Sequence, residues 1–441
     1  MFPAAAEARS GAGERAALAA EAEAALAAGE IELARLLALA VVEDEPRNSR
    51  ALAVLAAVGL SQQEAEAARV VAKRAFRFGK TELERFTAAR LAAKASADLD
   101  QFTASKYWLR RALHLVPSEE ARSATLRDYQ TLRQGSRVVV DLGFSIKPSS
   151  NVNSGAEDAL LTVDGVPTWF YFDRSSMALS GGEATAKVAL RYRLKESATA
   201  LTTLGFSISA RGVVLSDEAR AAAPAARGLD FAHMAVDGLL TQQWRLDEGQ
   251  VLSAGLTAGS IWFGGEPYAD RLRAELALSS QHGPALQSRI GFSVEQQWRA
   301  SGGAADRALA LDLGLQKALA SGDAVALRLE LGRTLSEDPN QQSRMLGASL
   351  RYRRGEPVAG MRLSGGLDLK TRDYPVFFNA IFNDSGRQDR SVSVSADLAL
   401  PKWEVFGFEP VLSLQASRTK SNVSRYSGDG VGIGFGIQSS F

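Results

Sequence analysis

The sequence predicts two domains of different class: an all-α, tetratricopeptide-like repeat domain over residues 1–135 and a 14-stranded antiparallel transmembrane β-barrel over residues 136–441. Apolar residues recur at helical spacing before Gly135 and alternate with polar residues after it. The alternating segments are long for strands, and their polar faces carry charges. Together these observations favour a barrel with a wet interior over a sandwich with a dry core.

Residues 1–135 are rich in Ala, Leu, Glu and Arg and contain several helix start signals. A Ser or Thr followed three residues later by Glu predicts a capping box, in which the hydroxyl accepts a bond from a backbone N–H at the helix start. A single Asp or Ser predicts a simple N-cap. The signals are capping boxes at Ser61–Glu64 and Thr81–Glu84, a cap at Asp100 before a helix that ends at Val116, and a cap at Ser118.

The helical region also shows the spacing of a repeat. The helix-stopping residues Pro46 and Pro117 are separated by roughly two tetratricopeptide units of about 34 residues each. The segment 104–117 resembles the second helix of such a unit. We therefore expect about three helical hairpins followed by a capping helix.

A repeat array of this kind usually presents a concave surface to a peptide or protein partner. On the segment 104–117, the candidate groove contacts are Tyr107, Trp108, Arg110 and Arg111. The alternative is a plain helical spacer, in which at least one of the two aromatic residues packs between helices. The sequence leaves both interpretations open.

Fourteen segments after Gly135 alternate apolar and polar residues, and most exceed the about 9–11 residues that a tilted strand needs to cross a bilayer. Strands of soluble proteins average about 5–6 residues. The segments are 137–147, 178–195, 200–214, 228–245, 249–263, 268–281, 285–299, 305–320, 323–334, 342–354, 358–371, 389–400, 404–419 and 428–441.

The polar faces of these segments carry charges at every second position. Lys187, Arg191 and Arg193 share one face of segment 178–195, and Arg351 and Arg353 share one face of segment 342–354. In a dry core each charge would need a buried partner. A polar lumen accommodates them, with the apolar face toward lipid and every backbone group paired in a closed barrel.

Connections between the segments alternate in length, as in membrane barrels with short turns on one side and longer loops on the other. An even number of strands places both chain ends on the short-turn side. The chain ends on Phe441, which resembles the assembly signal of outer-membrane barrels. The first residues, 1–15, lack an apolar run, so we expect any signal peptide to lie outside this numbering.

Composition argues against several classes of function. Lys plus Arg is 51 and Asp plus Glu is 50, so we expect no nucleic-acid partner. There is no Cys, and the three His residues are far apart, so we expect no metal site and no cofactor. Neither His233 nor His282 has a nucleophile on its own face nearby, so we expect no enzyme; the minority alternative is an outer-membrane hydrolase.

Four stretches, 143–153, 386–390, 407–410 and 418–423, together with the closing segment, resemble the Slam family, the surface lipoprotein assembly modulators. One departure is Ser149, where family members often carry Asp. The resemblance implies a periplasmic repeat domain, a 14-stranded outer-membrane barrel in a Gram-negative bacterium, and no nucleotide.

The resemblance also implies a translocon that exports lipoproteins or soluble haem- or metal-acquisition proteins. The implied partners are that secreted cargo, periplasmic chaperones, the barrel-assembly machinery and membrane lipid. The repeat domain would capture cargo or chaperone, and the barrel would give passage. A polysaccharide exporter or a passive porin remains an alternative that the mixed polar face does not decide.

The stretches that carry the resemblance supply candidate residues for two loops at the outer rim: Pro148, Ser150, Asn151, Asn153, Ser421 and Asn422. We expect Pro148 to end the first strand, since it cannot donate to a ladder, and the side chains of Asn151 and Asn153 to cap loop turns. The Ser150-Asn151 and Ser421-Asn422 pairs either meet at the rim or form two independent turns. The first and last strands close the barrel, and we hypothesise that substrate interacts at this seam.

Overall fold

The computed structural model describes residues 4–135, 137–303, 305–377, 386–403 and 408–439. The chain divides into a helical unit and a strand unit, with the boundary between residues 136 and 137. No helix in the described parts is long and apolar enough to cross a membrane.

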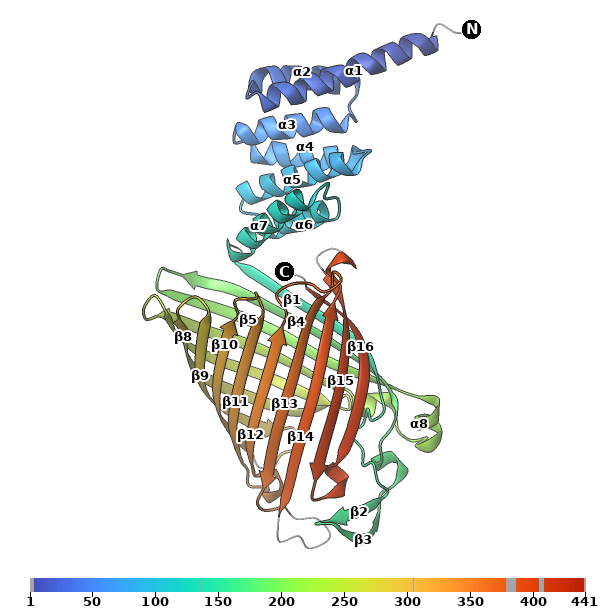
Figure 1. Cartoon of the computed structure of the whole chain (residues 1–441), viewed down its shortest axis with the longest axis vertical. Coiled ribbons are helices and arrows are strands. Elements are labelled where there is room, and N and C mark those ends of the chain that lie inside the picture. The colour runs from blue at the N-terminus through green and yellow to red at the C-terminus, as the bar shows by residue number, and fades with distance from the viewer. Residues whose placement is uncertain (1–3, 136, 304, 378–385, 404–407, 440–441) are drawn as a thin grey trace. The chain divides into compact units, whose positions relative to one another are not determined.

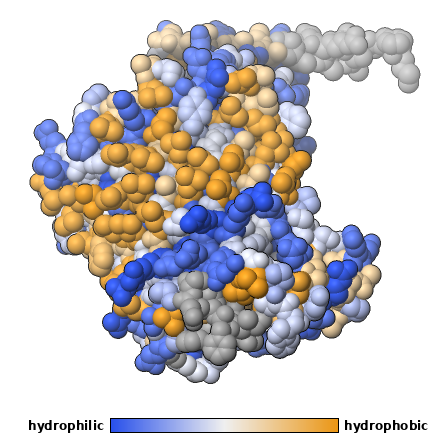
Figure 2. Space-filling view, turned by 60° about the horizontal axis from the view of Figure 1, so that its bottom comes forward, coloured by the Kyte–Doolittle hydropathy of each residue, from blue (hydrophilic) through white to orange (hydrophobic). Residues whose placement is uncertain are grey.

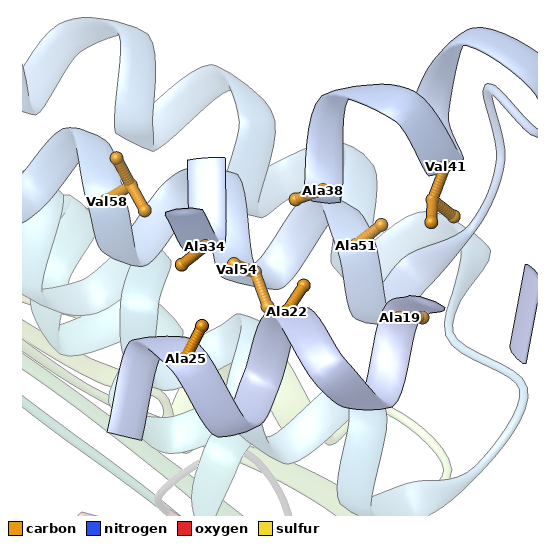
Figure 3. Packing of buried hydrophobic residues seen from close by; sticks show 9 residues of the cluster. All are labelled: Ala19, Ala22, Ala25, Ala34, Ala38, Val41, Ala51, Val54 and Val58. Atoms are coloured by element: carbon orange, nitrogen blue, oxygen red, sulfur yellow. The ribbon is translucent and has the colours of Figure 1, made fainter. Parts of the chain in front are cut away.

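The helical unit consists of consecutive antiparallel helices, three hairpins and a final helix, which confirms the predicted repeat-like architecture. Small side chains allow the first three helices to approach closely: Ala22, Ala34, Ala51 and Val54 are buried against one another (Figure 3). The helices are α1 (Ala4–Ala27), α2 (Ile31–Asp44), α3 (Ser49–Ser61), α4 (Ala65–Phe78), α5 (Glu82–Asp98), α6 (Phe102–Leu113) and α7 (Glu119–Gly135).

Two of the predicted helix caps are present. The Thr81 hydroxyl accepts a hydrogen bond from Glu84 N at 3.2 Å, while the Glu84 carboxylate accepts from Lys80 N rather than from Thr81. The Ser118 hydroxyl accepts from Ala121 N at 3.2 Å and begins α7.

Two other predicted caps are wrong. Ser61 is the last residue of α3, and its hydroxyl donates back to Val58 O instead of starting α4. Asp100 has a φ of +57° and lies in the turn before Gln101, the residue that precedes α6. That helix ends at Leu113 rather than at Val116.

The strand unit is a closed antiparallel barrel of 14 strands, as predicted (Figure 1). Each barrel strand pairs with its neighbours in chain order, and β1 pairs with β16 to close the sheet. The barrel strands are β1 (Val138–Ser149), β4 (Gly181–Glu196), β5 (Ala200–Leu215), β6 (His233–Arg245), β7 (Gln250–Phe263), β8 (Glu266–His282), β9 (Leu286–Arg299), β10 (Asp306–Ala318), β11 (Ala324–Leu335), β12 (Ser343–Arg353), β13 (Arg362–Tyr374), β14 (Arg387–Ala399), β15 (Phe408–Ser421) and β16 (Gly428–Ser439).

The two faces of the barrel wall differ as the alternation predicts. Leu142, Phe144 and Ile146 of β1 are exposed on the outside, and Figure 2 shows apolar residues gathered over the outer wall. The opposite face carries Arg–carboxylate pairs between strands: Arg191–Asp141, Arg271–Asp237, Arg289–Glu275 and Arg351–Asp368, with N–O distances of 2.6–2.8 Å. The polar lumen therefore holds these eight charges in four pairs.

The two ends of the barrel are unequal. We call the end that carries loop 150–180 the long-loop end, and the opposite end, where β1 starts and β16 finishes, the short-turn end. Loop 150–180 contains the hairpin β2 (Leu160–Val163) and β3 (Val166–Tyr171), and loop 216–232 contains α8 (Asp217–Ala222).

The expectation that Pro148 ends the first strand is wrong, because β1 continues to Ser149 and Pro148 pairs with Gly182 of β4. Arg137 O accepts a bond from Arg193 N, so the backbone groups of odd-numbered β1 residues face β4. Pro148 is even-numbered, and its nitrogen faces β16. The missing N–H therefore leaves the β1–β4 ladder intact and affects only the other edge.

Candidate functional site

The candidate functional site lies at the long-loop end, where loops 150–180 and 422–427 meet beside the β1–β16 seam. Val163 and Val423 form an isolated antiparallel bridge. Asp164 N donates to Asn422 O at 2.8 Å, and the Asn422 side chain donates back to Asp164 Oδ1 at 2.9 Å. Arg425 adds a bond to Ser154 O at 2.9 Å. We call these contacts between the two loops the clasp.

Asn422 ties a third loop into the clasp. Its side-chain nitrogen also lies 3.0 Å from Gly386 O, and its side-chain oxygen accepts from Gln388 N at 2.7 Å. One amide thus bonds to two other segments, around Asp164 and around Gly386–Gln388, that are far apart in the sequence. The partners of this side chain belong to other loops, so no local sequence pattern points to them.

The other predicted asparagines shape loop 150–180 itself. Asn151 exchanges two bonds with the backbone of Gly155, at 2.7 and 3.0 Å. Asn153 accepts from Leu179 N at 2.9 Å and donates to Met177 O at 2.7 Å. These bonds hold the start of the loop against its end. A side chain at Gly155 would place Cβ 2.2 Å from the Met177 carbonyl, so this approach requires glycine.

The two Ser-Asn pairs reach the same end of the barrel but bond to different neighbours. Ser150 lines a cavity beside the seam together with Asn151. The Ser421 hydroxyl accepts from Val423 N at 3.2 Å, within its own loop. The structure therefore brings both loops together, with Asp164 rather than Ser150 or Asn151 as the partner of Asn422.

An aromatic cluster beneath the clasp was not predicted. The guanidinium of Arg387 lies 3.3 Å from the ring centre of Tyr426, 4.2 Å from that of Tyr374 and 5.3 Å from that of Phe377. Its Nη2 also lies 2.6 Å from Asp389 Oδ2. This combination of cation–π contacts and an ion pair joins β13, β14 and the loop before β16. The sequence signal was the stretch 386–390, which carried the resemblance without a role for Arg387.

The seam beside the clasp is paired over only part of its length. Among the described residues, β1 and β16 are in register at four positions, from Gly143–Gln438 to Ile146–Phe435. A cavity of about 360 Å³ lies beside the rest of the seam. Its lining includes Lys147, Pro148, Asn151, Glu183, Gly430 and Gly432.

Loop 150–180 also carries a carboxylate with a perturbed pKa. The hydroxyl of Ser175, followed by the backbone N–H groups of Arg174 and Ser175, lowers the pKa of Asp173. These groups favour the charged form by donating hydrogen bonds to it. The loop therefore keeps this negative charge at neutral pH.

Three of the predicted groove residues of the helical unit, Tyr107, Trp108 and Arg111, contact one another, whereas Arg110 faces Tyr129. Trp108 is half-buried between helices, with its ring 5.3 Å from that of Phe76, and Arg111 lies over the Phe76 ring at 4.5 Å. Arg110 instead donates to the Tyr129 hydroxyl at 2.7 Å. Tyr107 is exposed, and its hydroxyl accepts from Arg111 at 2.9 Å.

A groove of about 590 Å³ lies elsewhere in the helical unit, between α5, α6 and α7. Its lining includes Phe86, Leu91 and Leu132, with the Arg90–Asp128 ion pair at its edge. This groove was not predicted, because its lining residues come from α5 and α7 as well as from segment 104–117. Phe441, the predicted assembly signal, lies outside the described residues.

Among the residues that the structure describes, no three or more His, Asp or Glu side chains cluster in a way that could hold a metal ion. The chemistry of the site is instead that of hydrogen bonds, ion pairs and aromatic contacts between loops. Such an arrangement joins loops that are far apart in the sequence.

The family model described as "Surface lipoprotein assembly modifier" matches residues 356–431. This stretch contains β13 to β15, with Arg387 at the start of β14, the loop that carries Asn422, and the start of β16. The match and the closed 14-strand barrel fit the resemblance to the surface lipoprotein assembly modulators. No curated protein matches the sequence.

Solved structures of two kinds are similar to parts of the chain. OmpT of Vibrio cholerae with loop L8 deleted, an outer membrane protein, is 10% identical, covers 69% of this chain and 100% of its own, and has a TM-score of 0.35. A bacterial polysaccharide outer membrane secretin is 6% identical over 68% of this chain and 98% of its own, with a TM-score of 0.36. The Arabidopsis OM64 TPR domain is 16% identical over 28% of this chain and 97% of its own, with a TM-score of 0.25. Scores this low carry no functional argument.

Proposed function

We propose that this protein is an outer-membrane translocon that delivers lipoproteins, or related soluble proteins, to the cell surface. The observation that carries the proposal is the match to surface lipoprotein assembly modifiers over residues 356–431, which falls on the barrel wall and on the loops of the candidate site. A closed barrel with an apolar outside and a charged lumen is the physical framework that such a role needs.

The proposed orientation follows from the two barrel ends. Membrane barrels keep short turns in the periplasm and long loops outside. The chain enters β1 and leaves β16 at the short-turn end, so residues 1–135 would form a periplasmic domain and residues 136–441 the barrel. The candidate site, with loop 150–180, would then face the outside of the cell.

In this proposal the helical unit captures cargo or a periplasmic chaperone, and the groove between α5 and α7 is the best-formed surface for it. Its apolar floor and charged edge suit an amphipathic segment of a partner protein. The protein would depend on the barrel-assembly machinery for insertion and would perform no chemical catalysis.

The test is co-expression with the products of neighbouring reading frames in a Gram-negative host, scoring cargo by protease accessibility on intact cells. Cargo that reaches the surface or the medium only when this protein is present supports the translocon. Cargo that stays periplasmic in every pairing, with the barrel correctly inserted, contradicts it. Uptake of sugars or ions into vesicles containing the purified protein would then favour a porin or a polysaccharide exporter.

A further inference from the structure

We infer that the outer wall of the barrel carries a binding surface for the phosphate headgroups of membrane lipids at its long-loop end. The surface consists of Arg333, Arg344, Arg390 and Lys420, which we call the basic belt. The inference goes beyond the proposed function, because it concerns the lipid around the barrel rather than the cargo. It rests on the proposed function only in taking the barrel as one that spans the outer membrane.

The first half of the basic belt lies on β11 and β12, directly after the apolar wall. Arg333 is opposite Arg344 in the register, and two residues along each strand Leu331 is opposite Leu346. Side chains two residues apart share a face of the sheet. Leu331 and Leu346 are 48% and 52% exposed on the outer wall, so the two arginines also point outward. Figure 2 shows hydrophilic residues bordering the apolar wall at this end.

The second half of the basic belt repeats this arrangement on β14 and β15. Arg390 is opposite Lys420, and both are exposed. Val392, two residues from Arg390 on the same face, is exposed on the outer wall. Residues directly opposite each other in an antiparallel pair have Cβ atoms about 4.5–5.5 Å apart, and like charges there destabilise the sheet. The basic belt therefore contains two unfavourable cross-strand pairs.

The lumen of the same strands shows how the protein usually balances an arginine. Arg351 of β12 faces the lumen and lies 2.7 Å from the Asp368 carboxylate. Arg344 of the same strand is opposite Asp373 of β13, yet no ion pair joins these two described side chains. Among the described residues, no ion pair involves any member of the basic belt. The counter-charge that the lumen supplies internally must therefore come from outside the chain.

The basic belt occupies one side of the barrel only. On the described strands β5 to β9, the outward residues near the long-loop end include no lysine or arginine; they are Val214, Met234, Trp262, Asp270 and Trp298. Toward the seam, Arg418 is paired with Asp429 at 3.4 Å, and Asp429 N donates to the Glu157 carboxylate. The unpaired positive charge is thus concentrated between β11 and β15.

A phosphorylated lipid fits both parts of this surface. Basic side chains that border the apolar wall of a membrane protein reach the level of the lipid headgroups. A guanidinium donates two parallel hydrogen bonds to phosphate oxygens, and a phosphate between two opposed cations relieves their repulsion. The acyl chains of the same lipid would lie along Leu331 and Leu346. Free phosphate would meet only the charged part, so we commit to the lipid.

The experiment uses the full chain with Val392→Cys as its single cysteine, labelled with a bimane fluorophore and reconstituted in phosphatidylcholine vesicles. The probe is phosphatidic acid with a nitroxide on its acyl chain, and the reference is phosphatidylcholine with the same nitroxide, whose phosphate is neutralised by choline. We expect the probe to quench the bimane about threefold more than the reference does. The matched label position is Leu272→Cys, an outward residue of β8 beside Asp270, where both lipids should quench equally.

Substitutions in the basic belt test its role in this enrichment. Arg390→Gln with Lys420→Gln should bring quenching at Val392→Cys down to the level of the reference lipid. Lys317→Gln removes a charge from the outward face of β10 at the short-turn end and should leave the enrichment unchanged. Excess inorganic phosphate should also leave it unchanged, because free phosphate has no acyl chains to contact the wall.

Equal quenching by the two lipids at Val392→Cys, or enrichment that survives the double substitution, overturns the inference. Complete displacement by inorganic phosphate overturns it too, since the belt would then be an anion site without preference for lipid. If the labelled protein does not fold, as judged on unheated gels, the label moves to Val394, which is 52% exposed. Because the vesicles contain no cargo, failed export with intact enrichment rejects the translocon alone, and export without enrichment rejects the lipid surface alone.

Discussion

Strand β1 has two neighbours, and the difference between them shows how this barrel is closed. Toward β4 it is in register at twelve positions, from Val138 to Ser149. Toward β16 the described residues are in register at four positions, from Gly143 to Ile146. Beyond them, the contacts of the clasp join loop 150–180 to loop 422–427. Backbone ladders hold the β4 side throughout, while the long-loop half of the β16 side depends on a few side chains.

Closure of the barrel and rigidity of the seam are therefore separate properties. The backbone hydrogen bonds of a regular ladder break together, because each paired strand holds its neighbour in position. Contacts made by single side chains, such as those of Asn422 and Glu157, are worth about 0.5–3 kcal/mol each and can be removed one at a time. The following substitutions act on one side of β1 and leave the other as control.

The largest effect is expected from Gly436→Val, in the paired part of the seam. A Cβ at Gly436 would lie 2.7 Å from Phe144 O and 3.1 Å from Ser145 Cβ, so β1 and β16 must move apart. We expect a loss of about 1–3 kcal/mol in the free energy of unfolding, measured in urea by tryptophan fluorescence.

The matched control for that substitution is Gly182→Val on the β4 side, where a Cβ meets no atom within 4 Å. It should cost well under half as much. If the two variants lost the same free energy of unfolding, the two edges of β1 would be equally tolerant, and the difference between them would be refuted.

Asn422→Ala should open the clasp. It removes the side-chain bonds to Asp164 Oδ1, Gly386 O and Gln388 N at once, and leaves only the backbone bond from Asp164 N to Asn422 O. We expect cleavage of loop 150–180 by added protease to become about tenfold faster, with the barrel still folded on unheated gels.

The control is Asn151→Ala, which removes bonds within loop 150–180 and none to loop 422–427. It should loosen the loop locally. It should leave disulfide crosslinking unchanged between Val163→Cys and Val423→Cys, which replace the two partners of the isolated bridge. If it lowered that crosslinking as much as Asn422→Ala, the clasp would not depend on Asn422 in particular.

Arg387→Lys should have a smaller effect on the same region. Lysine keeps the charge near Asp389 but loses the planar contact with the rings of Tyr426 and Tyr374, a contribution of about 0.5–2 kcal/mol. We expect protease cleavage of loop 150–180 to accelerate by less than in Asn422→Ala, about threefold. Arg390→Lys, on the same strand, serves as the control, and an equal effect there would contradict the cation–π role.

The sequence predicted the fourteen barrel strands because alternation is a local signal that each segment carries on its own. It failed at Ser61 and Asp100, since capping depends on where the chain turns, and Asp100 adopts a left-handed conformation. The long-range features were out of reach for a similar reason. Asn422 and Asp164 are separated by 258 positions, and no local sequence pattern at either residue predicts the contact.

Pro148 illustrates a third kind of limit. The residue was correctly singled out as one that cannot donate to a ladder, and wrongly expected to end its strand. Whether a missing N–H matters depends on which neighbour it faces. That depends on the register of the whole barrel, because a shift of one residue exchanges the two sides.

The smallest effect is expected from Pro148→Ala. This substitution tests most directly why the two edges of β1 differ. Alanine supplies an N–H directed at the Ile433 carbonyl, so the β16 edge of β1 becomes more like the β4 edge, with a gain of about 0.5–1 kcal/mol in the free energy of unfolding. Lys147→Ala is the matched control, because the backbone of Lys147 already pairs with Glu183 of β4, and it should add no ladder bond to the seam. A Pro148→Ala protein that is no more stable than the parent would mean that something other than the missing donor limits the register between β1 and β16.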